Sequence, residues 1–296
     1  MNIRHNILFV SFSILFVTVF SVQAQSAGKA SEIINRAVTS AGGNSTWHQN
    51  SNLVVHETQT RYEDEGTVQV NLIHTMSTIN TGYRIELSRT GINTVYGWDG
   101  TEFWASIDGK LGNHDLVNEA RRVISNAYFR FSLPFILDDS EQRAEFTGND
   151  SVNGSTTEVI KITYEKSPAD RYFSPVAKEH DHGSANAKAD HSVAKAEHDV
   201  VKVEHGGESA GHGHGHGGEE YNFYFSKENQ LTKVYFSHHG DGTYETILLE
   251  DFKVVDGINR EHKRTLLRSD GQTHYISNFT SIDFIKEIDD RLFSKP

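Results

Sequence analysis

The chain has 296 residues, a formal net charge of −12 and no cysteine. The negative charge argues against nucleic acid and anionic membrane surfaces as partners. Without cysteine the chain cannot form disulfides, use a thiol nucleophile or carry the cysteine-linked lipid anchor of bacterial lipoproteins.

Residues 1–24 have the pattern of an export signal. A short basic start at Arg4 precedes an apolar run from Ile7 to Phe20, and Val22-Gln23-Ala24 places small residues before a cleavage site. We expect cleavage after Ala24, with an uncleaved N-terminal anchor as the alternative. The run is shorter than the roughly 20 residues of a membrane span, and no later stretch is longer. These features predict a soluble, monomeric periplasmic protein with a single domain over residues 25–296.

The mature chain begins with a predicted helix and continues as short strands. Apolar residues recur at helical spacing over Ser31–Ala41, and Gly42-Gly43 would end that helix. Alternation with a period of two then predicts strands at Leu53–Arg61, Thr67–Met76, Tyr83–Ser88, Thr94–Trp98 and Glu102–Ile107.

A second predicted helix, Leu116–Phe131, interrupts the strands, and Pro134 marks a break after it. The alternating pattern then resumes, with turn signals such as Asn153-Gly154 between the runs. The predicted strands are Arg143–Gly148, Thr157–Tyr164, Tyr221–Phe225, Leu231–His238, Tyr244–Leu249, Phe252–Val255, Glu261–Leu267 and Thr273–Phe284.

A histidine-rich polar segment, residues 179–220, lies in the connection between two of these strands. Its histidines are His180, His182, His191, His198, His205, His212, His214 and His216, eight of the 17 in the chain. Neutral imidazole binds Zn²⁺, Cu²⁺ and Ni²⁺, so the segment could capture such ions. The residues between the histidines do not favour an ordered structure, and a long insertion in a loop costs little free energy. We expect a disordered insertion that is metal-competent without being catalytic, or a neutral, solubilising or pH-responsive loop.

The periodicity fits a barrel, a sandwich or a half-open barrel with a helical lid, and does not choose among them. Strand alternation gives a set of candidate ligand-lining side chains, for which ordinary core packing is the alternative. They are Val70, Leu72, Met76, Ile85, Leu87, Trp104 and Phe135.

Catalytic signatures are missing from the sequence. Neither a Gly-x-Ser-x-Gly motif nor a phosphate-binding glycine loop is present. The paired carboxylates Asp138-Asp139 and Asp289-Asp290 are adjacent in sequence, so each pair diverges and fits capping or turn roles better than acid–base chemistry. His56 and His74 are expected to be structural, and His238-His239 point to opposite faces. We expect a protein that is not an enzyme and requires no cofactor.

The order of these predicted helices and strands resembles that of the lipoprotein-carrier superfamily of Gram-negative bacteria, which comprises periplasmic carriers and outer-membrane receptors. The matching features are the helix ending at Gly42-Gly43, Trp47 before the first strand, Arg84-Ile85-Glu86, the hairpin Gly97–Trp104 and the ending Ile288–Pro296. Residues 125–139 and 250–258 resemble uncharacterised exported proteins of Bacteroidetes.

That resemblance implies a mainly β (α+β) fold. It would be an unclosed antiparallel β-barrel with an N-terminal helix, a central helical lid and an apolar cavity for acyl chains. We therefore expect a carrier or binding protein for a lipid or lipidated protein. A periplasmic buffer or chaperone for zinc, copper or nickel is the alternative, and a structural partner protein without a small ligand is a third possibility.

Overall fold

The computed structural model describes residues 25–78, 82–138, 143–164, 172–173, 219–237 and 244–296. They all belong to one compact unit, Met1–Ser174 with Gly217–Pro296; the second unit, Pro175–His216, lies outside the described residues. The predicted export signal, His238-His239 and the eight histidines of the predicted metal-binding segment also lie outside them. Strand β9 begins at Glu219, so the last two residues of that segment are part of the sheet. No helix in the described ranges could span a membrane.

The described residues form thirteen strands in one antiparallel sheet. The order is β6-β5-β4-β3-β2-β1-β13-β12-β11-β10-β9-β8-β7, so consecutive strands are neighbours and β1 pairs with β13. The strands are β1 (Asn52–Glu63), β2 (Gly66–Ser77), β3 (Tyr83–Arg89), β4 (Ile92–Trp98), β5 (Phe103–Ile107), β6 (Lys110–Leu111), β7 (Arg143–Val152), β8 (Ser155–Tyr164), β9 (Glu219–Phe225), β10 (Leu231–Ser237), β11 (Tyr244–Val255), β12 (Ile258–Leu267) and β13 (Thr273–Ile285).

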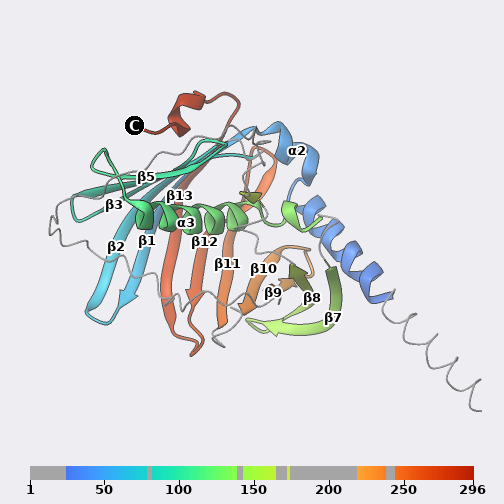
Figure 1. The fold of residues 1–296 in the computed structure, drawn as a ribbon. Helices are drawn as coiled ribbons and strands as arrows, with labels where there is room; N and C mark the ends of the chain where they lie inside the picture. The colour runs from blue at the N-terminus through green and yellow to red at the C-terminus, as the bar shows by residue number, and fades with distance from the viewer. Residues whose placement is uncertain (1–24, 79–81, 139–142, 165–171, 174–218, 238–243) are drawn as a thin grey trace, which may run out of the picture. The chain divides into compact units, whose positions relative to one another are not determined.

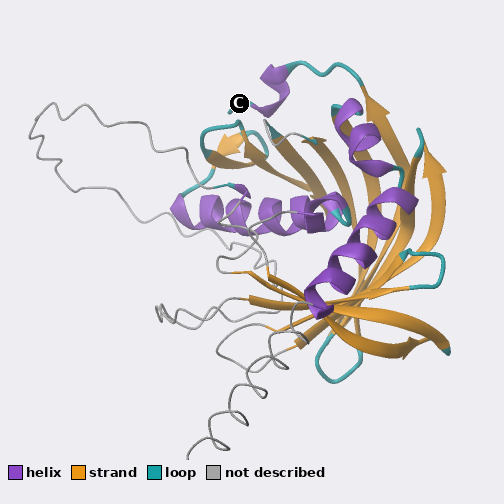
Figure 2. Ribbon diagram, turned by 90° about the vertical axis from the view of Figure 1, so that its right-hand side faces the viewer, coloured by secondary structure: helices purple, strands orange, loops and turns teal. Residues whose placement is uncertain are grey.

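Within the described part of the chain, no pairing joins the edge strands β6 and β7, so the sheet curves without closing (Figure 1). Helices lie on its concave side (Figure 2). They are a helix over residues 25–40, here called the N-terminal helix, α2 (Gly43–Gln49), α3 (His114–Ser132) and the 3₁₀ turn η1 (Phe135–Asp138). A second 3₁₀ turn, η2 (Asp290–Phe293), packs on the other face of the sheet. The predicted fold class, an unclosed antiparallel half-barrel with helices, is confirmed.

Strand alternation decides which side chains face the helices. In the β1–β2 ladder Leu53 is opposite Met76, Val55 is opposite His74 and Gln59 is opposite Val70, and all six are buried. Successive side chains of a strand point to opposite faces, so every second residue of a strand faces the core beneath α3. The helix contributes Ile124, Tyr128 and Phe131 from its buried face, and these recur at helical spacing.

The first helix ends before Gly42-Gly43, as predicted, and residues 43–49, for which no element was predicted, form α2 and bury Trp47. One predicted boundary was wrong. The sequence reading separated Tyr244–Leu249 from Phe252–Val255, which are one strand, β11. Asp251 has φ 54° within this strand, but the register with β12 is the same on both sides of it, since Glu250 is opposite Lys263 and Phe252 is opposite Glu261. By contrast, α3 ends at Ser132, before the break predicted at Pro134.

Gly42, between the N-terminal helix and α2, lies close to the β11–β12 turn. It has φ 116°, and a Cβ there would lie 2.3 Å from the carbonyl oxygen of Gly257 in the β11–β12 turn. Gly43 also has positive φ, 83°, but nothing lies within 4 Å of its Cβ position. Left-handed backbone costs an L-residue about 1–2 kcal/mol. We predict that Gly42→Ala lowers the free energy of unfolding in urea by more than the control Gly43→Ala. Equal losses would show that the contact with Gly257 is unimportant.

Candidate functional site

Six of the seven predicted ligand-lining side chains belong to one contiguous buried core on the concave side of the sheet. Val70, Leu72 and Met76 come from β2, and Ile85 and Leu87 come from β3; all five are less than a tenth exposed. Phe135 comes from η1 and stacks on Trp47 of α2, with ring centroids 4.6 Å apart. The structure therefore brings these six into the same core.

Trp104 lies on the other face of the sheet. It is opposite Gly97, and a Cβ at Gly97 would meet its indole ring at 2.0 Å. The indole Nε1 donates to the carbonyl of Phe293 at 2.7 Å, and the Arg84 guanidinium lies 5.7 Å from the ring centroid. The ring thus fastens η2 to the sheet and is separate from the other six candidates.

An aromatic cluster lies where α3 crosses β4 and β5. Trp98 and Phe103 are adjacent on the strands, with centroids 4.6 Å apart, and Tyr128 faces them from α3. Phe173, from the connection between β8 and β9, packs against all three at 5.3–5.6 Å and is fully buried. An aromatic side chain of the chain itself therefore occupies this part of the interior.

A buried ion cluster connects β12 to α3. The Glu261 carboxylate forms salt bridges with Arg260, at 3.5 Å, and with Arg264. Arg260 Nη1 donates to the carbonyl of Leu133 at 2.9 Å, and Arg264 Nη2 donates to that of Arg130 at 3.1 Å. The last carbonyls of a helix lack partners within the helix and carry partial negative charge. The two arginines therefore cap the C-terminal end of α3 from the sheet.

Aromatic rings complete the surroundings of Arg264. Its guanidinium carbon lies 4.4 Å from the ring centroid of Phe131, on α3, and 4.9 Å from that of Phe279, on β13. Such contacts stabilise a desolvated cation by up to about 2 kcal/mol. Arg264 thus joins α3 to the sheet by a hydrogen bond to Arg130 and a ring contact with Phe131, while its ion pair with Glu261 lies within β12.

A second buried carboxylate lies deeper along β1. Glu57 Oε2 is 2.9 Å from His74 Nε2, and Ser277 donates to Oε1. Gln59 Nε2 also donates to Oε1, at 3.3 Å, and Tyr83 Oη is 3.4 Å from His74 Nδ1. His74 is therefore a buried, hydrogen-bonded histidine, as the sequence reading expected.

Both carboxylates stay ionised despite their burial. Desolvation alone would raise the pKa of Glu57, but the His74 hydrogen bond and charge, together with Ser277, lower it below 4.5. Desolvation likewise acts to raise the pKa of Glu261, and the charges of Arg260 and Arg264 lower it below 4.5. Their contribution to stability is present above the unfolded pKa, 4.5, and is lost as the pH falls through the folded pKa values.

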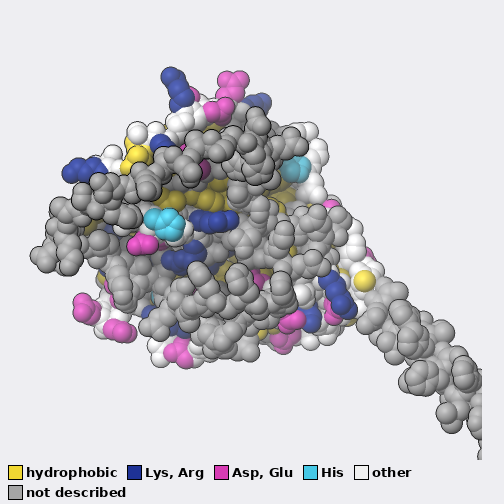
Figure 3. Space-filling model, viewed as in Figure 1, with side chains coloured by type: hydrophobic (Ala, Val, Ile, Leu, Met, Phe, Trp, Pro, Cys, Tyr) yellow, Lys and Arg dark blue, Asp and Glu magenta, His cyan; other side chains and the backbone are white. Residues whose placement is uncertain are grey.

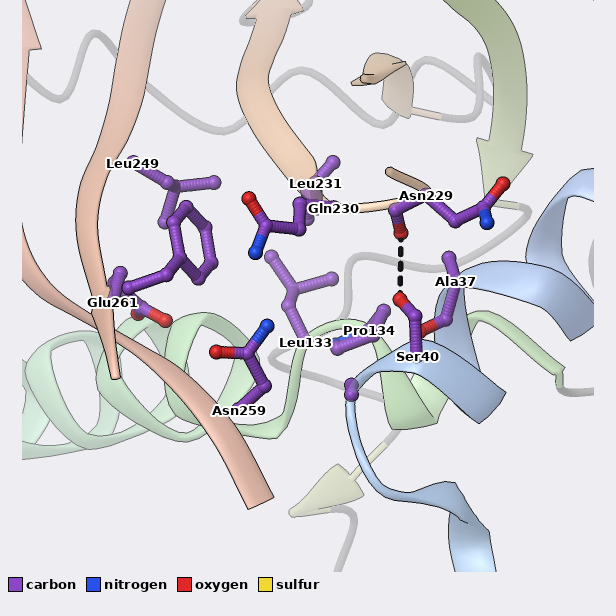
Figure 4. A pocket seen from close by; sticks show the side chains of 12 residues that line it. Ala37, Ser40, Leu133, Pro134, Asn229, Gln230, Leu231, Leu249, Asn259 and Glu261 are labelled. Carbon is purple, nitrogen blue, oxygen red and sulfur yellow. Dashed lines mark hydrogen bonds between the residues drawn. The ribbon is translucent and has the colours of Figure 1, made fainter. Parts of the chain in front are cut away.

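The cavity between the N-terminal helix, the end of α3 and the strands is small. Its lining includes Leu133, Leu231, Leu249 and Glu261, and Ser40 donates to the carbonyl of Asn229 at 3.0 Å across its rim (Figure 4). Its volume of about 20 Å³ holds roughly one water molecule. This cavity is therefore too small to hold an acyl chain.

Among the residues that the structure describes, no group of three or more His, Cys, Asp or Glu side chains is arranged to hold a metal ion. The predicted histidine ligands lie outside these residues, so their metal binding stays a prediction. On the described part of the chain, the site consists of an apolar surface with two buried ion clusters.

The ion clusters are what the sequence reading missed. Alternation along β1 places Glu57, Gln59 and Arg61 on the same face as Leu53 and Val55, and this polar interruption of an apolar face was a usable signal. Glu261 and Arg264 gave no such signal, because buried and partly exposed residues do not alternate along β12. Arg260 and Glu261 are both buried, and so are Arg264 to Leu266.

No family model and no curated protein matches the chain. Solved structures do. A LolA superfamily protein from Nitrosomonas europaea is similar at 12% identity and a TM-score of 0.50, over 91% of this chain and 98% of its own. An outer membrane lipoprotein-sorting protein domain from Vibrio parahaemolyticus matches at 12% and 0.49, over 91% and 97%. A DUF1329 family protein from Desulfovibrio piger matches at 7% and 0.49, over 90% and 97%. The first of these matches shows that the chain has a lipoprotein-carrier-like fold.

Glu261→Gln tests the ion cluster. The substitution leaves Arg260 and Arg264 buried without a carboxylate, and breaking a buried pair in this way costs about 3–5 kcal/mol. We predict a loss of that size in the free energy of unfolding in urea at pH 7. The loss should shrink as the pH falls through the folded-state pKa of Glu261, which is lowered below 4.5, because the native carboxylate then also becomes protonated.

The control is Glu250→Gln. Glu250 pairs with Lys263 at 2.9 Å, but both side chains are more than a third exposed, and such a pair contributes about 0–1 kcal/mol. If the two variants lose the same stability at pH 7, the buried cluster does not hold the fold together.

Proposed function

We propose that this chain is a non-enzymatic periplasmic member of the lipoprotein-carrier superfamily that holds the acyl chains of a lipid or lipidated protein against the concave face of its sheet. The observation that carries the proposal is the apolar surface of β2 and β3, which is continuous with the buried face of helix α3 in one core. Val70, Leu72, Met76, Ile85, Leu87 and Phe135 are the proposed lining. Export by the segment that ends at Ala24 belongs to the same proposal.

The conformation described above is the closed, unloaded state. Ligand pockets usually measure about 300–1,000 Å³, whereas the cavity here is about 20 Å³. An acyl chain can therefore enter only if a covering element moves. Helix α3 is the proposed lid, since it spans the apolar face and its C-terminal end is held by Arg260 and Arg264.

The energies of opening and loading are of the same order. Each hydrogen bond from a charged group contributes about 1.5–3 kcal/mol, so releasing the two arginine–carbonyl bonds costs a few kcal/mol. Each buried CH₂ group contributes about 0.8 kcal/mol, so roughly ten methylenes supply on the order of 8 kcal/mol. A long acyl chain can offset the opening of α3, and a short one cannot.

Phe173 marks where a ligand would enter. It fills the space between Trp98, Phe103 and Tyr128, which are large, flat apolar surfaces of the kind that line ligand pockets. In the proposed loaded state, part of the ligand takes the place of this ring.

The proposal agrees with what the similar solved proteins are called, a LolA superfamily protein and a lipoprotein-sorting domain. Neither name reports an enzyme. A closer relation to exported Bacteroidetes proteins remains part of the proposal. No observation on the described residues favours the metal buffer.

Deletion of residues 179–218 separates the carrier from the metal buffer. We predict that the shortened protein still binds a fluorescent C16 fatty acid with one saturable site, because the deletion removes none of the residues that are proposed to line the site. Zinc affinity, measured by calorimetry, should fall in the same protein.

Full-length protein treated with chelator is the control for the acyl measurement. Full-length protein that binds zinc but no acyl probe would contradict the carrier assignment. Loss of acyl binding in a shortened protein with a native circular dichroism spectrum would place the acyl site on the deleted segment instead.

A further inference from the structure

Arginines outnumber carboxylates among the buried charged residues of the concave face. Arg61, Arg260 and Arg264 are buried and Arg130 is half-buried, whereas the buried carboxylates are those of Glu57 and Glu261. Glu261 is shared by Arg260 and Arg264, and Glu57 is bonded to His74. The whole chain is acidic, with a formal charge of −12, so this local excess of positive charge is unusual.

Arg61 and Arg130 are the unpaired members, and they converge on one side chain. Arg130 Nη1, from α3, donates to the Tyr275 hydroxyl at 2.5 Å. Arg61 is opposite Tyr275 in the β1–β13 ladder, and its Nε donates to Gln59 at 2.5 Å. Among the described residues, no carboxylate forms a salt bridge with either guanidinium.

Arg61 is buried and Arg130 is half-buried. Arg61 is 4% exposed, and its burial lowers the pKa of the guanidinium. Burial acts in the same direction on Arg130, but Tyr275 and Glu245 raise its pKa overall. Arg61 donates to Gln59 through Nε, and Arg130 donates to Tyr275 through Nη1. An anion placed between the two guanidinium groups would form charge-assisted hydrogen bonds with both.

The neighbours of this site are apolar. Val68 is opposite Arg61 on β2, and Leu266 is opposite Tyr275 on β12. Figure 3 shows apolar side chains next to Lys and Arg side chains over helix α3. A planar guanidinium recognises carboxylate or phosphate oxygens in a bidentate manner. An amphiphile with an anionic headgroup would therefore place its charge here and its chain along the apolar core.

We propose that Arg61, Arg130 and Tyr275 form an anion-binding site that selects amphiphiles with a phosphate or carboxylate headgroup. This inference rests on the proposed acyl-binding function and specifies its ligand class. The shared chemistry is the anionic oxygen cluster, whether it belongs to a lipid headgroup or to free phosphate.

Two matched probes test it by calorimetry on the full chain. Oleoyl lysophosphatidic acid and monoolein share an acyl chain and glycerol, and differ in the phosphate. The wild-type protein should bind the phosphate-bearing probe at least about tenfold more tightly, as expected for charge-assisted hydrogen bonds. Inorganic phosphate alone should bind far more weakly. Phosphate that binds as tightly as the lysolipid would overturn the amphiphile assignment.

Arg61→Gln and Arg130→Gln should each reduce the preference for the phosphate-bearing probe about tenfold while monoolein affinity stays constant, which also reports that the fold is intact. Arg143→Gln is the control, because that side chain is 70% exposed on the edge strand β7. A preference that survives both substitutions would overturn the proposed site. Equal binding of the two probes by the wild type would refute the anion site alone, and no binding of either would refute the carrier function itself.

Discussion

The buried contact of Glu261 with Arg260 and Arg264 is the interaction on which the arrangement of this protein depends. It lies on β12, near the middle of the sheet order, and reaches the last turn of α3 through two arginine–carbonyl hydrogen bonds. Removing one partner of such a cluster leaves an uncompensated buried charge, so the loss of either the carboxylate or an arginine destabilises the whole cluster. The position of α3 over the concave face follows from this cluster as much as from apolar packing.

A helix held by a few polar contacts is well suited to act as a lid. Apolar packing of α3 on the sheet can be replaced by an acyl chain at little net cost, because the same surface stays buried. The hydrogen bonds of Arg260 and Arg264 cannot be replaced in that way, and they define a discrete closed state. The same geometry places Arg61 and Arg130 beside the apolar core, so one face combines chain binding with recognition of an anionic group.

Much of the fold was predictable, because alternation along strands such as Tyr83–Arg89 directly reports one buried face. The unclosed half-barrel was predicted from the resemblance to the lipoprotein-carrier superfamily, because alternation alone fits several β architectures. Irregular points were not predictable. Gly42 permits a second helix through a backbone conformation and a close approach to Gly257 that no periodicity reveals. Asp251 has a positive φ of 54° inside β11, where the sequence reading ended one strand and began another.

The candidate site was predictable only in part. Six apolar side chains were placed on the correct surface, whereas Trp104 was not, because β5 is short and its two faces are both buried. The ion clusters join residues more than a hundred positions apart, such as Arg130 and Tyr275, and only the assembled sheet brings them together. The alternation of apolar residues shows which face of a strand is buried. It does not show which charged residues, distant in sequence, come together on that face.

Movement of α3 on loading is the central claim, and a spin-label distance measures it directly. The chain has no cysteine, so Asn126→Cys on the exposed face of α3 and Asn278→Cys on the exposed face of β13 give a unique labelled pair. The account predicts a single distance in the lipid-free protein and a longer one at saturating oleoyl lysophosphatidic acid. A bound ligand with an unchanged distance would contradict it, because no acyl chain fits the closed interior.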